Sequence, residues 1–116
     1  MNIKIGIIGQ GFVGTAVKEG LCRHYDIKTF DKYNDSKSTC ATLEQLVSST
    51  NVIFVCLPTP MLKSGECDTS IVEETVVNID SIGEDKIIII KSTVPPGTTK
   101  RLNDYCKTCH VVFNPE

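Results

Sequence analysis

The chain has 116 residues, and its 12 basic and 14 acidic side chains give a formal net charge of -2. This length suits one domain whose core buries about two thirds of the unfolded surface. The dispersed charges form no basic stripe, which excludes a surface for the phosphate backbone of nucleic acid. With no stretch of ~18 apolar residues and no signal-peptide pattern, we expect a cytoplasmic protein without a membrane partner.

Short apolar runs alternate with helix-period segments in the first half of the chain. The pattern predicts a strand over the isoleucines at 3–8, a helix from Phe12 to about Arg23 and a weaker strand from Ile27 to Phe30. Thr42 and Gln45 have capping-box spacing, which predicts the start of a second helix.

The second half repeats this alternation. Val52–Leu57 is continuously apolar, which indicates a strand buried on both faces. Ser70 and Glu73 have capping-box spacing and predict another helix start. The remaining predicted elements are a strand at Ile87–Ile90, a helix from Thr98 to about Tyr105 and a strand at Val111–Phe113. Strands that alternate with helices indicate βαβ units and a parallel sheet.

A complete G-x-G-x-x-G motif, Gly9-Gln10-Gly11-Phe12-Val13-Gly14, follows the first strand and opens the first helix. In a dinucleotide-binding loop, Gly9 permits the tight turn, Gly11 lets a pyrophosphate approach the backbone, and Gly14 lets the helix pack closely on the strand. The helix start then binds the anion. The alternative is that the glycines only serve a tight turn.

Asp31 lies at the end of the second predicted strand, 22 residues after Gly9. An acid at this place accepts hydrogen bonds from the adenosine ribose hydroxyls, and its charge repels a 2'-phosphate, which favours NAD over NADP. The neighbouring Lys32 leaves a 2'-phosphate possible. The alternative for Asp31 is a solvated loop acid.

These features predict an α/β fold: a doubly wound, Rossmann-like parallel sheet of about five strands in the order 3-2-1-4-5, with helices on both faces. Two loops at strand ends have unusual compositions, Leu57-Pro58-Thr59-Pro60 and Lys91–Thr98. Their prolines fix the backbone while Thr59, Ser92 and Thr93 offer hydroxyls, a combination suited to holding a ribose and a nicotinamide. Stiff turns with helix caps are the alternative.

Five motifs together resemble the N-terminal NAD-binding domain of the UDP-glucose/GDP-mannose dehydrogenases, over the whole chain. They are GQGFVG, Asp31, VCLPTP (55–60), KSTVPPGTT (91–99) and FNPE (113–116). The resemblance implies two successive NAD-dependent oxidations, which convert the C6 hydroxymethyl of a nucleotide sugar to a carboxylate through a cysteine thioester.

The resemblance also implies roles for individual residues. Gly9 to Gly14, including Gln10, Phe12 and Val13, would hold the pyrophosphate, and Asp31 the adenosine ribose. Thr93 would lie near the catalytic water, and Glu116 at the substrate edge of the cleft. The residues expected on the nicotinamide side are Leu57, Pro58, Thr59, Ser92, Thr93 and Val94.

The chain departs from the family pattern in several ways. The loop over 32–40 is short, and the family's nucleophilic cysteine, its catalytic lysine and asparagine, and its nucleotide-binding domain have no counterpart here. We therefore expect residues 1–116 to be the NAD-binding domain of a larger, homo-oligomeric dehydrogenase, inactive alone and able to bind nucleotide sugar only with the missing half. The alternatives are a free-standing nucleotide-sensing module and an NADP-dependent hydroxyacid or 6-phosphogluconate type dehydrogenase, which Asp31 disfavours.

Six cysteines and a C-x-x-C-H sequence, Cys106 to His110, also need an interpretation. C-x-x-C-H is the attachment sequence for c-type haem, but the predicted compartment and fold disfavour haem. A zinc site needs further ligands, and no second cysteine pair is present. We expect reduced thiols and no metal.

Overall fold

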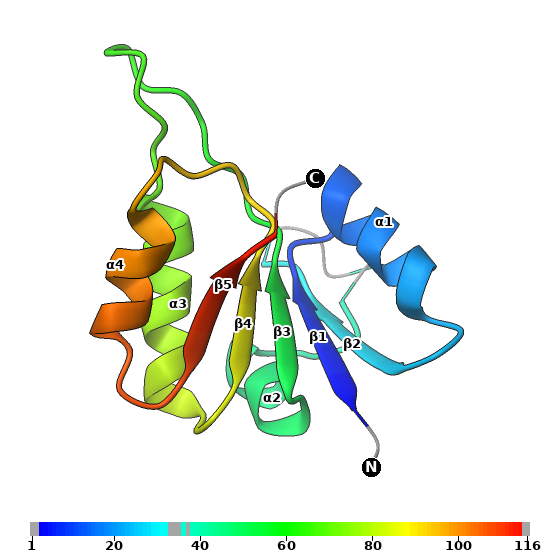
Figure 1. Cartoon of the computed structure of the whole chain (residues 1–116). Coiled ribbons are helices and arrows are strands. Elements are labelled where there is room, and N and C mark those ends of the chain that lie inside the picture. The colour runs from blue at the N-terminus through cyan, green and yellow to red at the C-terminus, as the bar shows by residue number, and fades with distance from the viewer. Residues whose placement is uncertain (1–2, 33–35, 37, 115–116) are drawn as a thin grey trace.

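The computed structural model describes residues 3–32, 36 and 38–114 (Figure 1). Its elements follow one another in the order β1 (Lys4–Ile8), α1 (Phe12–Leu21), β2 (Asp26–Phe30), α2 (Leu43–Ser49), β3 (Val52–Val55), α3 (Ser70–Ile82), β4 (Ile87–Ile90), α4 (Thr98–Tyr105) and β5 (His110–Phe113). The predicted alternation of strands and helices is confirmed, with small differences at the boundaries.

One of the two predicted helix caps is confirmed and the other is wrong by one position. The Thr42 hydroxyl oxygen accepts a hydrogen bond from the Gln45 amide at 3.1 Å and caps α2. Ser70, in contrast, is the first residue of α3, and its amide and hydroxyl donate to Oδ1 of Asp68 at 3.0 and 2.6 Å. Ser70 therefore pairs with the charged carboxylate of Asp68, two residues upstream, and does not form the predicted capping box with Glu73.

The five strands of the described chain form one parallel sheet, as predicted, but their order is β2-β1-β3-β4-β5. The predicted order 3-2-1-4-5 is therefore wrong, because β3 pairs with β1 instead of lying beyond β2. The side chains explain this. Ile53 and Val55 of β3 are fully buried, which suits a central strand, whereas β2 begins with the exposed Asp26 and carries Lys28.

The segment around Thr39 covers the outer edge of β2, where the predicted order would place another strand. The amides of Thr39 and Cys40 both donate to the Thr29 carbonyl at 3.0 Å, and the Thr29 amide donates to the Thr39 hydroxyl at 2.7 Å. These bonds satisfy part of an edge that would otherwise expose unpaired backbone groups.

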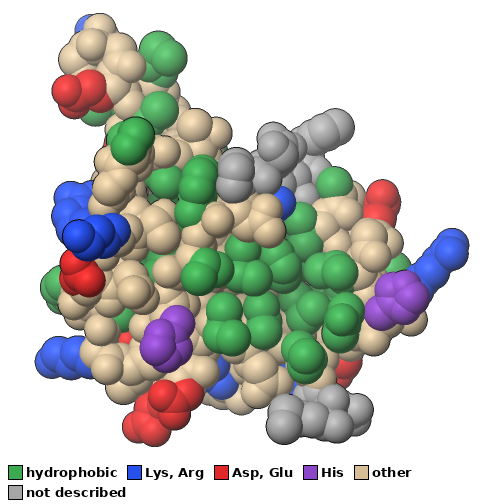
Figure 2. Space-filling model, viewed as in Figure 1, with side chains coloured by type: hydrophobic (Ala, Val, Ile, Leu, Met, Phe, Trp, Pro, Cys, Tyr) green, Lys and Arg blue, Asp and Glu red, His purple; other side chains and the backbone are tan. Residues whose placement is uncertain are grey.

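Helices lie on both faces of the sheet, as predicted. The core lies between the strands and α2, α3 and α4, and α1 packs on β1 from the other side (Figure 1). On this second face, side chains of β3, β4 and β5 form an apolar surface, defined by Val52, Phe54, Ile87, Ile89 and Val112. Figure 2 shows hydrophobic side chains gathered over the middle of the molecule.

None of the helices in the described part of the chain is both long enough and apolar enough to cross a membrane.

Candidate functional site

The glycine loop joins β1 to α1 through a turn that leaves no room for a side chain at two positions. Gly9 has a φ of 92°, and a Cβ there would lie 2.5 Å from the Cys56 carbonyl oxygen. A Cβ on Gly14 would lie 1.8 Å from the Gly9 carbonyl oxygen. The tight turn and the close packing of α1 on the end of β1 therefore both require glycine.

Gly11 has the opposite surroundings. It is the N-cap residue of α1, with extended backbone, and a Cβ built on it would meet no atom within 4 Å. Phe12 and Val13 follow as the first residues of the helix, whose first turn contains no acidic side chain. This open helix start can accept an anion close to the backbone.

Asp31 connects the end of β2 to the glycine loop. Its Oδ2 accepts a hydrogen bond from the Gln10 amide at 2.8 Å, and its own amide donates to the Ser38 hydroxyl at 2.8 Å. The Gln10 side chain is 2% exposed and donates to the Gly9 carbonyl oxygen at 3.3 Å, so it turns into the protein. The structure thus brings the predicted acid and the predicted loop together, although they are far apart in sequence.

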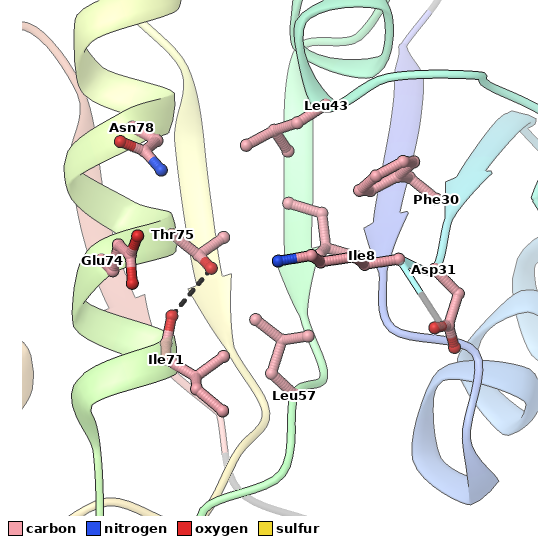
Figure 3. Close-up of a pocket in the computed structure, with 10 residues that line it drawn as sticks. Ile8, Phe30, Asp31, Leu43, Leu57, Ile71, Glu74, Thr75 and Asn78 are labelled. Atoms are coloured by element: carbon pink, nitrogen blue, oxygen red, sulfur yellow. Dashed lines mark hydrogen bonds between the residues drawn. The ribbon is translucent and has the colours of Figure 1, made fainter. Parts of the chain in front are cut away.

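A cavity of about 420 Å³ opens beside Asp31 at the carboxyl ends of β1, β2 and β3 (Figure 3). Its volume lies within the range of ligand pockets, ~300–1,000 Å³. The residues that line it are Ile8, Phe30, Asp31, Lys32, Leu43, Leu57, Ile71, Glu74, Thr75 and Asn78.

A second cavity of about 200 Å³ lies between the loops that follow β3 and β4. Ser92, 6% exposed, donates its hydroxyl to the Leu57 carbonyl oxygen at 2.7 Å and so fixes one loop to the other. Leu57 lines both cavities. The residues that line the second cavity are Cys56, Leu57, Pro58, Thr59, Lys91, Ser92 and Thr93.

Among the predicted site residues that the structure describes in full, those of the glycine loop and Val94 line neither cavity. Val94 is half-buried and packs against the hydrophobic core, and neither cavity includes it. Glu116 lies outside the described residues. Asn114, which precedes it in the chain, donates its amide to the Ile90 carbonyl oxygen at 3.1 Å and accepts a hydrogen bond from Lys91 Nζ at 3.5 Å.

Sequence reasoning did not assign the wall that α3 contributes to the larger cavity. Ile71, Glu74, Thr75 and Asn78 line the cavity, whereas the core side of the same helix carries Val72, Val76 and Ile79. The helical spacing of these four residues shows that they share a face. It does not show that this face lies opposite Asp31, because that depends on the pairing of β3 beside β1 in the sheet.

The arrangement defines the class of protein. A glycine loop, an acid bonded to that loop and two cavities meet where β1 and β3 diverge, which is the switch point of a doubly wound sheet with this strand order. These features are those of a dinucleotide-binding, Rossmann-like domain.

Comparison with known proteins gives the family. The sequence model described as "UDP-glucose/GDP-mannose dehydrogenase family, NAD binding domain" matches residues 27–116. The chain belongs to this family, it corresponds to the family's NAD-binding domain, and its cofactor is NAD.

Similar proteins agree with this assignment. Protein MJ1054 of Methanocaldococcus jannaschii is 31% identical over 98% of this chain, which spans 16% of that protein. The UDP-glucose 6-dehydrogenase of Streptococcus pneumoniae is 26% identical over 98% of this chain, which spans 36% of that enzyme. A solved UDP-glucose dehydrogenase of Pyrobaculum islandicum shares the fold, with a TM-score of 0.86, 22% identity and coverage of 100% of this chain and 36% of that one.

This chain is also shorter than its relatives within the aligned region. The comparison with the pneumococcal enzyme extends over 141 positions, whereas the chain has 116 residues. The relative therefore carries residues that this chain lacks. The short loop at 32–40 is the place where we expect the difference.

Proposed function

We propose that this chain is the cofactor-binding part of a nucleotide-sugar 6-dehydrogenase, which oxidises the C6 hydroxymethyl of a UDP- or GDP-sugar to a carboxylate with two NAD. The observation that carries the proposal is the hydrogen bond from the Gln10 amide to Asp31, which joins the acid to the glycine loop at the switch point of the sheet. By itself the chain binds NAD and does not complete the reaction.

The described residues fit an extended dinucleotide. The open surroundings of Gly11 leave room for the pyrophosphate at the start of α1, where backbone amides and the helix dipole favour negative charge. Asp31 lines the larger cavity, where its carboxylate accepts hydrogen bonds from the hydroxyls of the adenosine ribose. The nicotinamide half then extends from Gly11 toward the second cavity, which Thr59 and Thr93 line.

Residues on the nicotinamide side have different tasks in this proposal. Ser92 acts through Leu57, because its hydroxyl is hydrogen bonded to the Leu57 carbonyl oxygen. Thr93 is exposed, and in this proposal it lies near the catalytic water. NAD, when bound, accepts the hydride from the sugar carbon. Glu116 faces the sugar, but its place in the structure is outside the described residues.

A thermal shift measurement tests the cofactor assignment directly. NAD at about 100 times its Kd adds about 2.7 kcal/mol to the free energy of unfolding, which raises the Tm of a domain of this size by roughly 10 °C. We expect NADP at the same concentration to give a much smaller shift, because its 2'-phosphate would stand beside the Asp31 carboxylate.

The variants Asp31→Ala and Asp26→Ala show whether this carboxylate is responsible. Asp26 is an exposed acid at the other end of β2 and provides the matched control. Asp31→Ala should lose most of the NAD shift while Asp26→Ala keeps it. Equal shifts with NAD and NADP in the unaltered chain would overturn the assignment of Asp31.

A further inference from the structure

The larger cavity has two chemically different walls (Figure 3). On one side, the strand ends and the start of α2 provide aliphatic and aromatic side chains, Ile8, Phe30, Leu43 and Leu57. On the other side, α3 provides polar groups, Glu74, Thr75 and Asn78, next to Ile71. Asp31 lies on the side away from α3 (Figure 3). A flat, largely apolar ring with polar atoms along one edge suits such a slot.

The polar groups of α3 differ in how far they are already engaged. The Thr75 hydroxyl donates its proton to the Ile71 carbonyl oxygen at 2.8 Å, as the dashed line in Figure 3 shows. The Glu74 carboxylate and the Asn78 amide make no side-chain hydrogen bond to any described residue. Both side chains are exposed and line the cavity, so they can bind a ligand without first breaking a bond within the protein.

We propose that Glu74 reads the six-position of the purine base and selects a 6-amino purine against a 6-oxo purine. The inference rests on the proposed NAD function, because Asp31 fixes the ribose on the far side of the slot from α3. The base then extends from the ribose across the apolar wall, and its six-position edge meets α3. The exocyclic amine of adenine donates a hydrogen bond to the Glu74 carboxylate.

The direction of selection follows from the chemistry of the two side chains. An ionised carboxylate can only accept hydrogen bonds, whereas an amide both donates and accepts. A 6-oxo purine has no proton at the six-position itself, since its nearest donor is N1–H, so the Glu74 carboxylate would lose the hydrogen bond of the adenine amine and face a carbonyl oxygen. Asn78 can rotate its amide to suit either base, so the discrimination depends on Glu74 alone.

The experiment compares two dinucleotides that differ in the purine at the six-position and in the proton on the adjacent N1. NAD and nicotinamide hypoxanthine dinucleotide are titrated separately into the 116-residue chain by calorimetry. We expect NAD to bind about tenfold more tightly, the size of effect produced by an unpaired or opposed polar group in a binding site. In Glu74→Gln, whose amide can donate to the 6-oxo group, the ratio of the two affinities should fall to less than about threefold.

Glu84→Gln is the matched control, because Glu84 is an exposed acid just beyond α3 that does not line this cavity. It removes the same charge and should keep the tenfold ratio. Equal affinities for the two dinucleotides in the unaltered chain, or an unchanged ratio in Glu74→Gln, would overturn the role of Glu74 and leave the proposed function intact. A failure of the unaltered chain to bind NAD at all would instead contradict the proposed function.

Discussion

Two loops at opposite edges of the sheet each direct backbone amides toward an aspartate, and they do so to different degrees. At the carboxyl edge, one amide of the glycine loop, that of Gln10, donates to Asp31. At the amino edge, the amides of residues 107–109 donate to Asp80 of α3 at 3.0, 3.1 and 3.0 Å. The amides of residues 107–109 already donate to a carboxylate of the protein itself, so this loop has a structural role.

The hydrogen bonds at Asp80 also determine its ionisation. Burial of this carboxyl by itself raises its pKa, but the three amides and the Thr108 hydroxyl outweigh burial and lower the pKa from 3.8 to about 2. The same loop contains the C-x-x-C-H sequence. Burial, with the charge of Asp80 nearby, raises the pKa of Cys106 to about 11, so its thiol is a poor nucleophile at neutral pH.

The two edges show that backbone amides gathered at a loop can either stabilise the fold or bind a ligand, depending on whether the protein supplies their acceptor. Amides that bind an internal acid hold a loop in place. Amides next to an open glycine remain available to a ligand, as at Gly11, where no atom lies within 4 Å of the missing Cβ. Substitutions at the two edges should therefore affect different properties.

Gly14→Ala should have the largest effect. The added methyl would lie 1.8 Å from the Gly9 carbonyl oxygen, so α1 or the glycine loop must move. We expect a loss of about 3 kcal/mol or more in the free energy of unfolding, at the upper end of overpacking in a core. Chemical denaturation measures it. Gly20→Ala is the control, because a Cβ there meets no atom within 4 Å and alanine favours a helix interior. Equal stability of the two variants would contradict the close packing of Gly14 against the Gly9 carbonyl oxygen.

Asp80→Ala should destabilise the chain without changing its cofactor affinity. Removing the acceptor of three amides at the partly exposed amino edge should cost about 2 kcal/mol in the free energy of unfolding. NAD affinity by calorimetry should stay unchanged, because none of the residues that line the two cavities belongs to this loop. Asp104→Ala, at an exposed acid of α4, should be nearly neutral in both measurements. A loss of NAD affinity in Asp80→Ala would remove the distinction between the two edges.

The stabilisation by Asp80 should also depend on pH. Its folded pKa, about 2, lies below its ordinary value of 3.8, so the stabilisation is complete above the ordinary value and is lost as the pH falls toward 2. Denaturation measured between these limits should show a smaller acid-induced loss in Asp80→Asn than in the unaltered chain. Parallel pH profiles would mean that Asp80 does not gain its stabilisation from ionisation.

Gly11→Ala should have the smallest effect on stability and a clear effect on binding. The site has space for a methyl group, and the loss in unfolding free energy should stay below about 1 kcal/mol, the difference between glycine and alanine at an N-cap. The methyl would occupy the place where the pyrophosphate approaches, so NAD affinity should fall about tenfold. Unchanged affinity would place the pyrophosphate elsewhere.

The fold class could be predicted from the sequence because its signals are local. The apolar runs, the glycine motif and Asp31 each depend on short stretches of the chain. The strand order could not be predicted in the same way, because it depends on which strand pairs with the free edge of β1, a contact between segments far apart in the sequence. The continuous apolarity of Val52–Leu57 was a signal for a central strand, and the polar residues of β2 were a signal for an edge.

The candidate site was predicted in part for the same reason. Motif residues such as Gly9, Asp31 and Thr59 are recognisable in the sequence and lie at the carboxyl edge of the sheet in the structure. The hydroxyl of Ser92 looks like a ligand-binding group in the sequence, but it is hydrogen bonded to Leu57. The polar face of α3 carries no motif, so its place in the cavity became visible only in three dimensions.

The most direct test of the account is an NMR titration of the ¹⁵N-labelled chain with NAD, which reports on both edges of the sheet at once. We predict that the backbone amide signals of Gly9–Gly14, Asp31, Leu57 and Thr59 shift as NAD is added, while those of Lys107, Thr108 and Cys109 stay in place. Shifts at residues 107–109 with an unperturbed glycine loop would contradict binding of NAD at the carboxyl edge of the sheet.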